Sequence, residues 1–212
     1  MPVLDSFLLP QNSKLALWKQ DETFEELLQL FKNYSGNDFN LENSLSKKRN
    51  TEKLITALLM LHLTGLQDHK IIYSPTGKPL LEESPFKFIS ISHSGIYTAV
   101  ILSAQREVAI DVQTFSKHIN AGSDYFLSAT EQSEVGLETP YEWLHVYWCT
   151  KETAIKYFDI SGIDFKNNLQ VKINEKSKKS TALCEIFKDD KRWILKVDYQ
   201  LTEDYVLAYA IQ

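Results

Sequence analysis

A short apolar strand that carries a carboxylate constrains the fold of this chain more than any other feature. Residues 108–113 read Val-Ala-Ile-Asp-Val-Gln, and a strand turns successive side chains to opposite faces. Asp111 and Gln113 therefore share one face of the strand. An unpaired buried charge is costly, so an interior Asp111 should meet a partner from another element. The alternative is that Asp111 lies at a sheet edge or a bend.

A second segment, residues 148–156, offers that partner. It reads Trp-Cys-Thr-Lys-Glu-Thr-Ala-Ile-Lys, which predicts a helix with Glu152 and Lys156 on one face. If this helix packs on the strand, Asp111 and Glu152 form a carboxylate pair with a lysine beside it. Such a pair suits Mg²⁺, which binds oxygen and keeps water and substrate phosphates in its shell. The ordinary alternative is a solvated surface Glu–Lys pair worth about 0.3–0.5 kcal/mol. Lys151, next to Glu152, can be either structural or functional.

Two further motifs precede these segments in the chain. Residues 92–95 read Ser-His-Ser-Gly after an apolar strand, and residues 77–79 read Gly-Lys-Pro. Each motif alone is weak, but the four in this order resemble the signature of Sfp-type 4′-phosphopantetheinyl transferases, members of the holo-acyl-carrier-protein synthase superfamily. The resemblance is firm from about Ser74 to Phe158. The opening and closing segments are similar to the family in less specific residues.

The resemblance implies an enzyme that moves 4′-phosphopantetheine from coenzyme A to a serine of an apo acyl or peptidyl carrier protein and releases 3′,5′-ADP. It also implies Mg²⁺ as the cofactor, with Asp111 and Glu152 as metal ligands and Glu152 as the base toward the serine. Lys156 matches a lysine that holds a phosphate oxygen. Many family members carry a second acid two residues after the aspartate, where this chain has Gln113. We expect the Gln113 amide to serve the metal directly or through water, with weaker metal binding.

The same resemblance assigns the binding of coenzyme A. Ser92 and His93 match positions that contact its nucleotide end, with His93 donating to a phosphate. Lys78, in its Gly–Pro turn, and Lys156 complete the expected set. The basic residues 47–49 open a helix, where some members bind the 3′-phosphate, although a solvated helix start explains them nearly as well. The ordinary alternatives are a backbone-satisfied histidine for His93 and an exposed loop lysine for Lys78.

The predicted fold class is α+β, with two pseudo-repeated lobes, residues 1–113 and 114–212. Each lobe has helices packed on a small antiparallel sheet, and the resemblance implies an active site in the cleft between the lobes. Tyr97 and Tyr205 open strands that look like the same edge of the repeat. The turn at residues 105–107 predicts a hairpin between the strands on either side of it. Other expected elements are helices at 43–64, 128–137 and 140–160, and strands at 87–92, 97–102, 171–173, 183–188, 193–199 and 205–211.

Composition sets the broad class of protein. The chain has 212 residues, 43% of them hydrophobic and 24% charged, as in ordinary globular proteins. A net charge of −5 gives no support to nucleic-acid binding, which needs a basic face. Two cysteines form no disulfide framework, and the start lacks the basic region of a signal peptide. We therefore expect a cytoplasmic monomer whose partners are coenzyme A and a carrier protein, with no nucleic acid and no membrane.

Two other functions compete with this interpretation. A non-catalytic module of the same fold that binds coenzyme A or a carrier protein is the main alternative. Gln113 favours it, whereas Asp111, Glu152 and Lys156 favour the enzyme. A different Mg²⁺-dependent nucleotide enzyme would need a glycine-rich phosphate loop or more acidic motifs, and the sequence has neither. The remaining histidines, His145 among them, show no ligand spacing and receive no role.

Overall fold

The computed structural model describes residues 3–10, 12–66, 70–82, 84–135 and 140–212. The chain divides into two compact units, Met1–Glu107 and Val108–Gln212, which we describe separately. Each unit has its own cluster of buried apolar side chains. None of the helices in the described part of the chain is both long and apolar enough to span a membrane.

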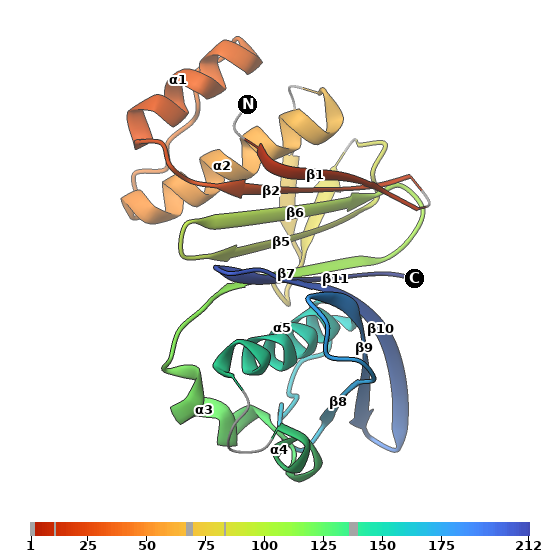
Figure 1. Ribbon diagram of the computed structural model, residues 1–212. Coiled ribbons are helices and arrows are strands. Elements are labelled where there is room, and N and C mark those ends of the chain that lie inside the picture. Colours follow the sequence, from red (N-terminus) through yellow and green to blue (C-terminus); the bar gives the residue numbers. More distant parts are fainter. Residues whose placement is uncertain (1–2, 11, 67–69, 83, 136–139) are drawn as a thin grey trace. The chain divides into compact units, whose positions relative to one another are not determined.

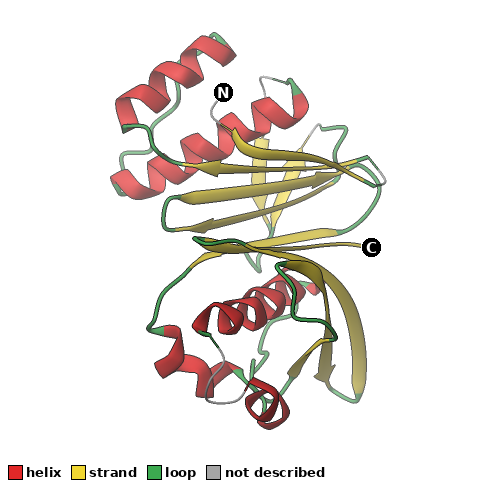
Figure 2. Ribbon diagram, viewed as in Figure 1, coloured by secondary structure: helices red, strands yellow, loops and turns green. Residues whose placement is uncertain are grey.

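Unit 1 consists of an antiparallel sheet, two helices and a separate hairpin (Figures 1 and 2). The sheet has the order β1-β2-β6-β5, and α2 packs on its central strands β2 and β6. Thr23 and Glu26 form a capping box at the start of α1. Ser46 caps α2, so this helix begins later than the predicted residue 43. The elements are β1 (Val3–Leu9), β2 (Ser13–Lys19), α1 (Phe24–Ser35), α2 (Lys47–Thr64), β3 (Lys70–Tyr73), β4 (Pro79–Glu82), β5 (Phe88–Ser94) and β6 (Tyr97–Ser103).

Unit 2 is built round one long helix, α5, against a five-stranded antiparallel sheet of order β7-β11-β10-β9-β8. Figure 2 shows this sheet curving along the helix. Pro140 precedes the first turn of α5, and Asp159, with a left-handed φ of 53°, ends it before the predicted stop at residues 161–162. The elements are β7 (Val108–Thr114), α3 (Ile119–Phe126), α4 (Ala129–Val135), α5 (Tyr141–Phe158), β8 (Leu169–Ile173), β9 (Lys179–Lys188), β10 (Lys191–Leu201) and β11 (Tyr205–Ile211).

The predicted hairpin between the strands flanking residues 105–107 is wrong. Both edges of β6 are taken by strands of unit 1, β2 and β5. β7 instead pairs antiparallel with β11, so it is the first strand of unit 2. The division therefore falls after Glu107, whereas the sequence pattern predicts a boundary after Gln113. As a consequence Asp111 lies in the same unit as Glu152.

The prediction of an α+β fold with helices packed on antiparallel sheets is confirmed, and part of the strand order recurs: β2-β6-β5 in unit 1 corresponds to β7-β11-β10 in unit 2. In unit 2 the first strand, β7, precedes the helices and pairs antiparallel with the last strand, β11. In unit 1 the strand that precedes the helices is β2, which pairs antiparallel with the last strand, β6, while β1 lies at the edge of the sheet. Tyr97 opens β6 opposite Lys19, the last residue of β2. Tyr205 opens β11 opposite Thr114, the last residue of β7. The two tyrosines noted in the sequence thus occupy matching positions in the two sheets.

Candidate active site

The carboxylate strand and the helix with the Lys-Glu motif pack directly against each other in unit 2. Lys156, in the last turn of α5, donates from Nζ to Asp111 Oδ1 at 2.7 Å and to the carbonyl oxygen of Ile110 at 3.1 Å. Asp111 is only 5% exposed. The cost of burying its charge is therefore offset by a cation from the neighbouring helix.

Glu152 lies one helical turn before Lys156 and belongs to the same electrostatic group. Burial raises the pKa of the Glu152 carboxyl, the negative charge of Asp111 raises it further, and Lys156 opposes both effects. A carboxylate whose pKa lies above the usual value is a stronger base at neutral pH. The environment therefore suits Glu152 for accepting a proton.

The ligands available for a metal ion are the two carboxylates and the amide of Gln113, two residues after Asp111 on β7. Within the described residues, no group of three or more His, Cys, Asp or Glu side chains is placed to hold a metal. This donor set fits Mg²⁺, which is commonly bound through one or two carboxylates plus water and substrate phosphates. It does not suit zinc, which takes three or four protein ligands. Burial, and then Asp111, raise the pKa of the nearby Cys149 thiol, which therefore stays protonated.

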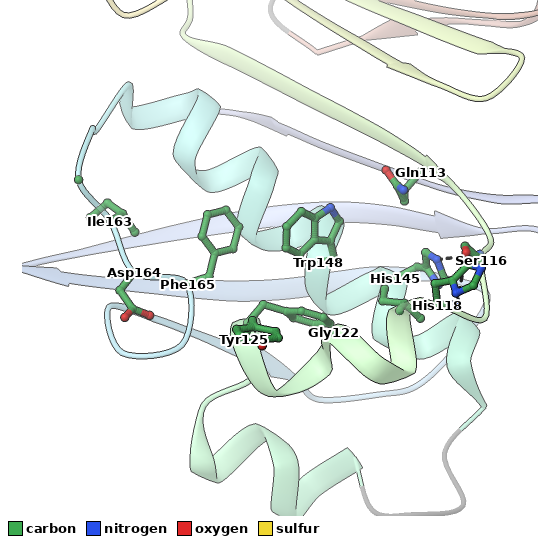
Figure 3. Close-up of a pocket in the computed structure, with 13 residues that line it drawn as sticks. Gln113, Ser116, His118, Gly122, Tyr125, His145, Trp148, Ile163, Asp164 and Phe165 are labelled. Atoms are coloured by element: carbon green, nitrogen blue, oxygen red, sulfur yellow. Dashed lines mark hydrogen bonds between the residues drawn. The ribbon is translucent and has the colours of Figure 1, made fainter.

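A cavity of about 1000 Å³ opens in unit 2 beside Gln113 (Figure 3). Trp148 lies in its wall and contacts the rings of two phenylalanines. The ring of Phe165 stacks on Trp148 at a centroid distance of 5.2 Å, and Phe126 meets it edge-on at 5.3 Å. The remaining lining residues are mostly apolar or uncharged, and Asp164 brings one carboxylate. The cavity suits an extended, largely neutral ligand group.

Residues 107–210 match the family model of the 4′-phosphopantetheinyl transferase superfamily. This part of the chain belongs to that superfamily. The matched residues form almost all of unit 2 and include Asp111, Glu152 and Lys156. A comparison with curated proteins gave no match.

Within this transferase domain, His145 is a buried residue that the sequence analysis left without a role. Its Nδ1 lies 3.0 Å from the carbonyl oxygen of Tyr141, and its Nε2 accepts from the backbone N–H of Ser116 at 3.1 Å. Burial lowers the pKa of His145, which matches a neutral ring that donates from Nδ1 and accepts at Nε2. His145 thus ties the segment after β7 to α5. Its spacing of seven residues before Glu152 was the available signal, because two helical turns return to the same face.

His93 lies in unit 1, ahead of the matched transferase residues. Its Nε2 lies 3.1 Å from Thr56 Oγ1 on α2. It lines a pocket of about 380 Å³ together with Lys47 and Lys48 from the first turn of that helix. Two lysines of the basic run that opens α2 therefore lie in the same pocket as His93, which Glu22 and Glu52 also line, and Lys48 Nζ lies 3.8 Å from Glu52 Oε1.

The other two residues expected to bind coenzyme A lie in different surroundings. Lys78 Nζ lies 2.7 Å from Glu107 Oε1, and both side chains are partly buried. Gly77 precedes Lys78 in the turn and has a φ of 89°. A positive φ of this kind favours glycine at that position. Ser92 is 5% exposed on β5. The pocket beside His93 is lined by lysines of α2, not by Lys78 or Ser92, among the residues the structure describes.

Proposed function

We propose that the protein transfers 4′-phosphopantetheine from coenzyme A to a serine of an apo acyl or peptidyl carrier protein, with Mg²⁺, and releases 3′,5′-ADP. The observation that carries this proposal is the group formed by Asp111, Glu152 and Lys156 inside the matched transferase domain. Two coupled carboxylates with a lysine beside them supply a base and a cation in one place. Phosphoryl transfer needs both.

In the proposed reaction the serine hydroxyl attacks the phosphorus that bears the pantetheine arm. A new oxygen–phosphorus bond forms, the bond to the 3′,5′-ADP oxygen breaks, and the serine proton passes to Glu152. The raised pKa of Glu152 suits this step, because a base with a pKa nearer neutrality takes the proton more readily. Lys156 lies beside the carboxylate pair. Its positive charge stabilises a phosphate oxygen of the substrate as negative charge develops on that oxygen in the transition state.

Asp111, Glu152 and Gln113 are the residues proposed to hold Mg²⁺. When bound, the ion neutralises charge on the pyrophosphate and lowers the barrier to its cleavage. Lys156 compensates the charge of Asp111 through their 2.7 Å ion pair. Gln113 is neutral, so the set has one negative charge fewer than one with three acids. Metal affinity should therefore depend more strongly on oxygens of the substrate.

Each unit offers one further recognition element. The pocket with His93, Lys47 and Lys48 is proposed for the 3′-phosphate of the nucleotide, because it combines two ammonium groups with a helix N-terminus. The cavity beside Gln113 is proposed for the pantetheine arm, whose methylene, dimethyl and amide groups suit a wall of Trp148 and Phe165 with polar edges.

The test is a transfer assay that reads the mass of the carrier protein. An apo carrier protein incubated with the protein, coenzyme A and Mg²⁺ should gain one phosphopantetheine group, and EDTA should prevent it. Glu152→Gln should abolish the gain, whereas Glu142→Gln, a matched change in the first turn of α5, should leave it intact. If several unrelated carriers gained no mass while coenzyme A still bound, the chain would be a binding module of the same fold.

A further inference from the structure

Lys151 is the most deeply buried charged side chain of the helix that carries the candidate active site. The side chains of Lys151 and Glu131 are both 0% exposed, and Lys151 Nζ lies 2.7 Å from Glu131 Oε2. The same ammonium donates to three backbone carbonyls, those of Phe126 at 2.5 Å, Phe165 at 2.9 Å and Leu169 at 3.1 Å. Lys151 is therefore fully occupied by partners inside the protein.

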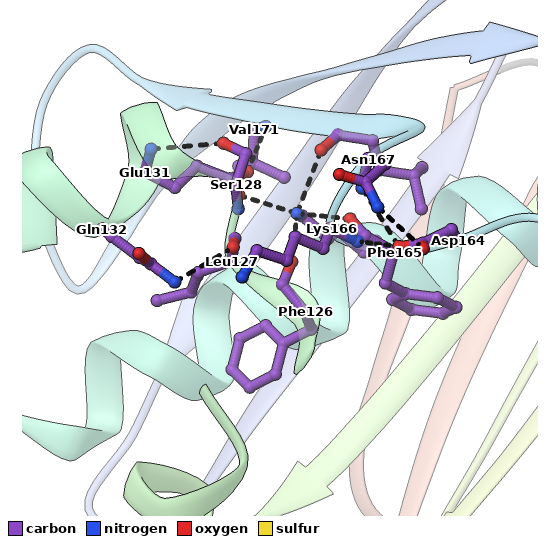
Figure 4. Close-up of polar contacts among 12 residues, drawn as sticks. Phe126, Leu127, Ser128, Glu131, Gln132, Asp164, Phe165, Lys166, Asn167 and Val171 are labelled. Atoms are coloured by element: carbon purple, nitrogen blue, oxygen red, sulfur yellow. Dashed lines mark hydrogen bonds and ion pairs between the residues drawn. The ribbon is translucent and has the colours of Figure 1, made fainter. Parts of the chain in front are cut away.

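Glu131 completes the network from α4 (Figure 4). Its Oε2 accepts from the backbone N–H of Ser128 at 2.6 Å, and its Oε1 accepts from the N–H of Val171 on β8 at 2.6 Å. One ion pair thus joins the end of α3, the start of α4, the segment after α5 and the first residues of β8.

Two of the carbonyls bound by Lys151 belong to the residues whose rings shape the large cavity. The rings of Phe126 and Phe165 both contact the ring of Trp148, which precedes Lys151 by three residues on α5. Figure 3 shows Phe165 beside Trp148. Residues three apart on a helix are neighbours on its surface. The helix therefore holds both phenylalanines twice, through their rings at Trp148 and through their backbones at Lys151.

A buried ion pair is a poor device for stability alone, because well-packed apolar residues of similar volume often serve as well or better. Apolar residues, however, cannot bind three carbonyl oxygens and so cannot fix the backbone of residues 126 and 165 relative to α5. The ion pair therefore differs from apolar packing in that it fixes the positions of backbone carbonyl groups.

We propose that Lys151 and Glu131 are positioning residues for the substrate arm. They fix Phe126 and Phe165 against Trp148 and thereby set the aromatic wall of the cavity. This inference rests on the proposed function, in which that cavity takes the pantetheine arm of coenzyme A. It predicts that disturbing the pair changes recognition of the arm and leaves recognition of the nucleotide unchanged.

The experiment compares two ligands that differ by the phosphopantetheine group, coenzyme A and 3′,5′-ADP, by calorimetric titration with Mg²⁺ present, and wild type measured with both ligands accounts for the effect of the additional phosphate. The test variant is Lys151→Met combined with Glu131→Gln, which removes both charges together. Its affinity for coenzyme A should fall about tenfold or more, equivalent to about 1.4 kcal/mol of lost contact between the arm and the displaced aromatic wall. Its affinity for 3′,5′-ADP should stay within about twofold of wild type, since that ligand makes no contact with the arm cavity. Hydrogen exchange should rise in residues 163–169.

The matched control is Leu195→Ala, which truncates a fully buried residue of the same core. It lowers stability without touching the Lys151 network, so its ratio of the two affinities should equal that of wild type. If the double variant does not fold, Glu131→Gln alone is tested in its place. This change keeps an acceptor oxygen for the N–H of Val171. A folded variant that discriminates the two ligands as wild type does would overturn the inference, and so would a wild type that binds both equally. If wild type discriminates but transfers no arm, the proposed function fails while the inference stands.

Discussion

Replacing Lys156 by methionine tests the ion pair of the candidate active site, because methionine keeps much of the side-chain length and removes the charge. Lys156 Nζ lies 2.7 Å from Asp111 Oδ1, and the two side chains are 29% and 7% exposed. Exposed ion pairs contribute about 0–1 kcal/mol, whereas removing one partner of a fully buried pair costs about 3–5 kcal/mol. This pair lies between those limits, so we expect a loss of about 2 kcal/mol in unfolding free energy. For a chain of this length that loss lowers Tm by about 4–8 °C.

The loss should depend on pH. Lys156 lowers the pKa of Glu152 against the effects of burial and Asp111, so removing the lysine raises that pKa further. A carboxyl whose folded-state pKa lies above its unfolded value adds stability at low pH, and this contribution is lost as pH rises through the folded-state pKa. The variant should therefore differ most from wild type at about pH 8 and least near the unfolded glutamate pKa of about 4.3.

Mg²⁺ should restore part of the loss at pH 8, because it supplies the cation that Asp111 and Glu152 then lack. With Mg²⁺ at about ten times its Kd, binding to the folded state adds about 1.4 kcal/mol. Urea unfolding with and without Mg²⁺ measures both effects. Lys172→Met is the control, since it removes a 2.9 Å ion pair with Glu185, which keeps Arg192. A Lys156 variant as stable as wild type at pH 8, or an equal Mg²⁺ response in the control, would refute the reasoning.

Three further predictions concern the remaining site residues. Asp111→Asn and Glu152→Gln should each lower turnover in the carrier-mass assay at least about a hundredfold, because each removes negative charge from the proposed metal site; near-normal rates would contradict these roles. Glu152→Gln should also be more stable than wild type at neutral pH, since burial raises the Glu152 pKa, and the difference should vanish in acid, as urea unfolding at several pH values will show. Gln113→Ala should cost less turnover than either carboxylate change, and Gln113→Glu should tighten Mg²⁺ binding in calorimetry; equal damage from Gln113→Ala would make it a principal ligand.

The α+β class and the meeting of Asp111 with Lys156 follow from short-range patterns. A carboxylate set in an apolar strand requires a partner, and helical spacing fixes which side chains share a face with Glu152. Four residues of separation bring Lys156 to that face, and the structure has its Nζ on Asp111. These relations involve one strand and one helix, so few other contacts can alter them.

The pairing of β7 could not be predicted in the same way. Residues 105–107 have the composition of a hairpin loop, yet they connect the two units. β6 is already paired on one side with β2, a strand that lies some 80 residues earlier. Which strand pairs with a given sheet edge depends on the packing of the whole unit. The residues of a local turn do not determine that packing.

Lys151 and Lys156, on one helix, also show that local sequence does not predict every tertiary contact. Each residue turns an α-helix by about 100°, so the two lysines point about 140° apart, whereas Glu152 and Lys156 differ by about 40°. The spacing alone says that Lys151 leaves the face of Glu152, but not whether it enters water or the core. Its acceptors come from residues 126, 131, 165 and 169, which only the folded unit brings together. Two lysines of a single motif therefore serve different ends, one offering charge to the candidate site and the other shaping the cavity beside it.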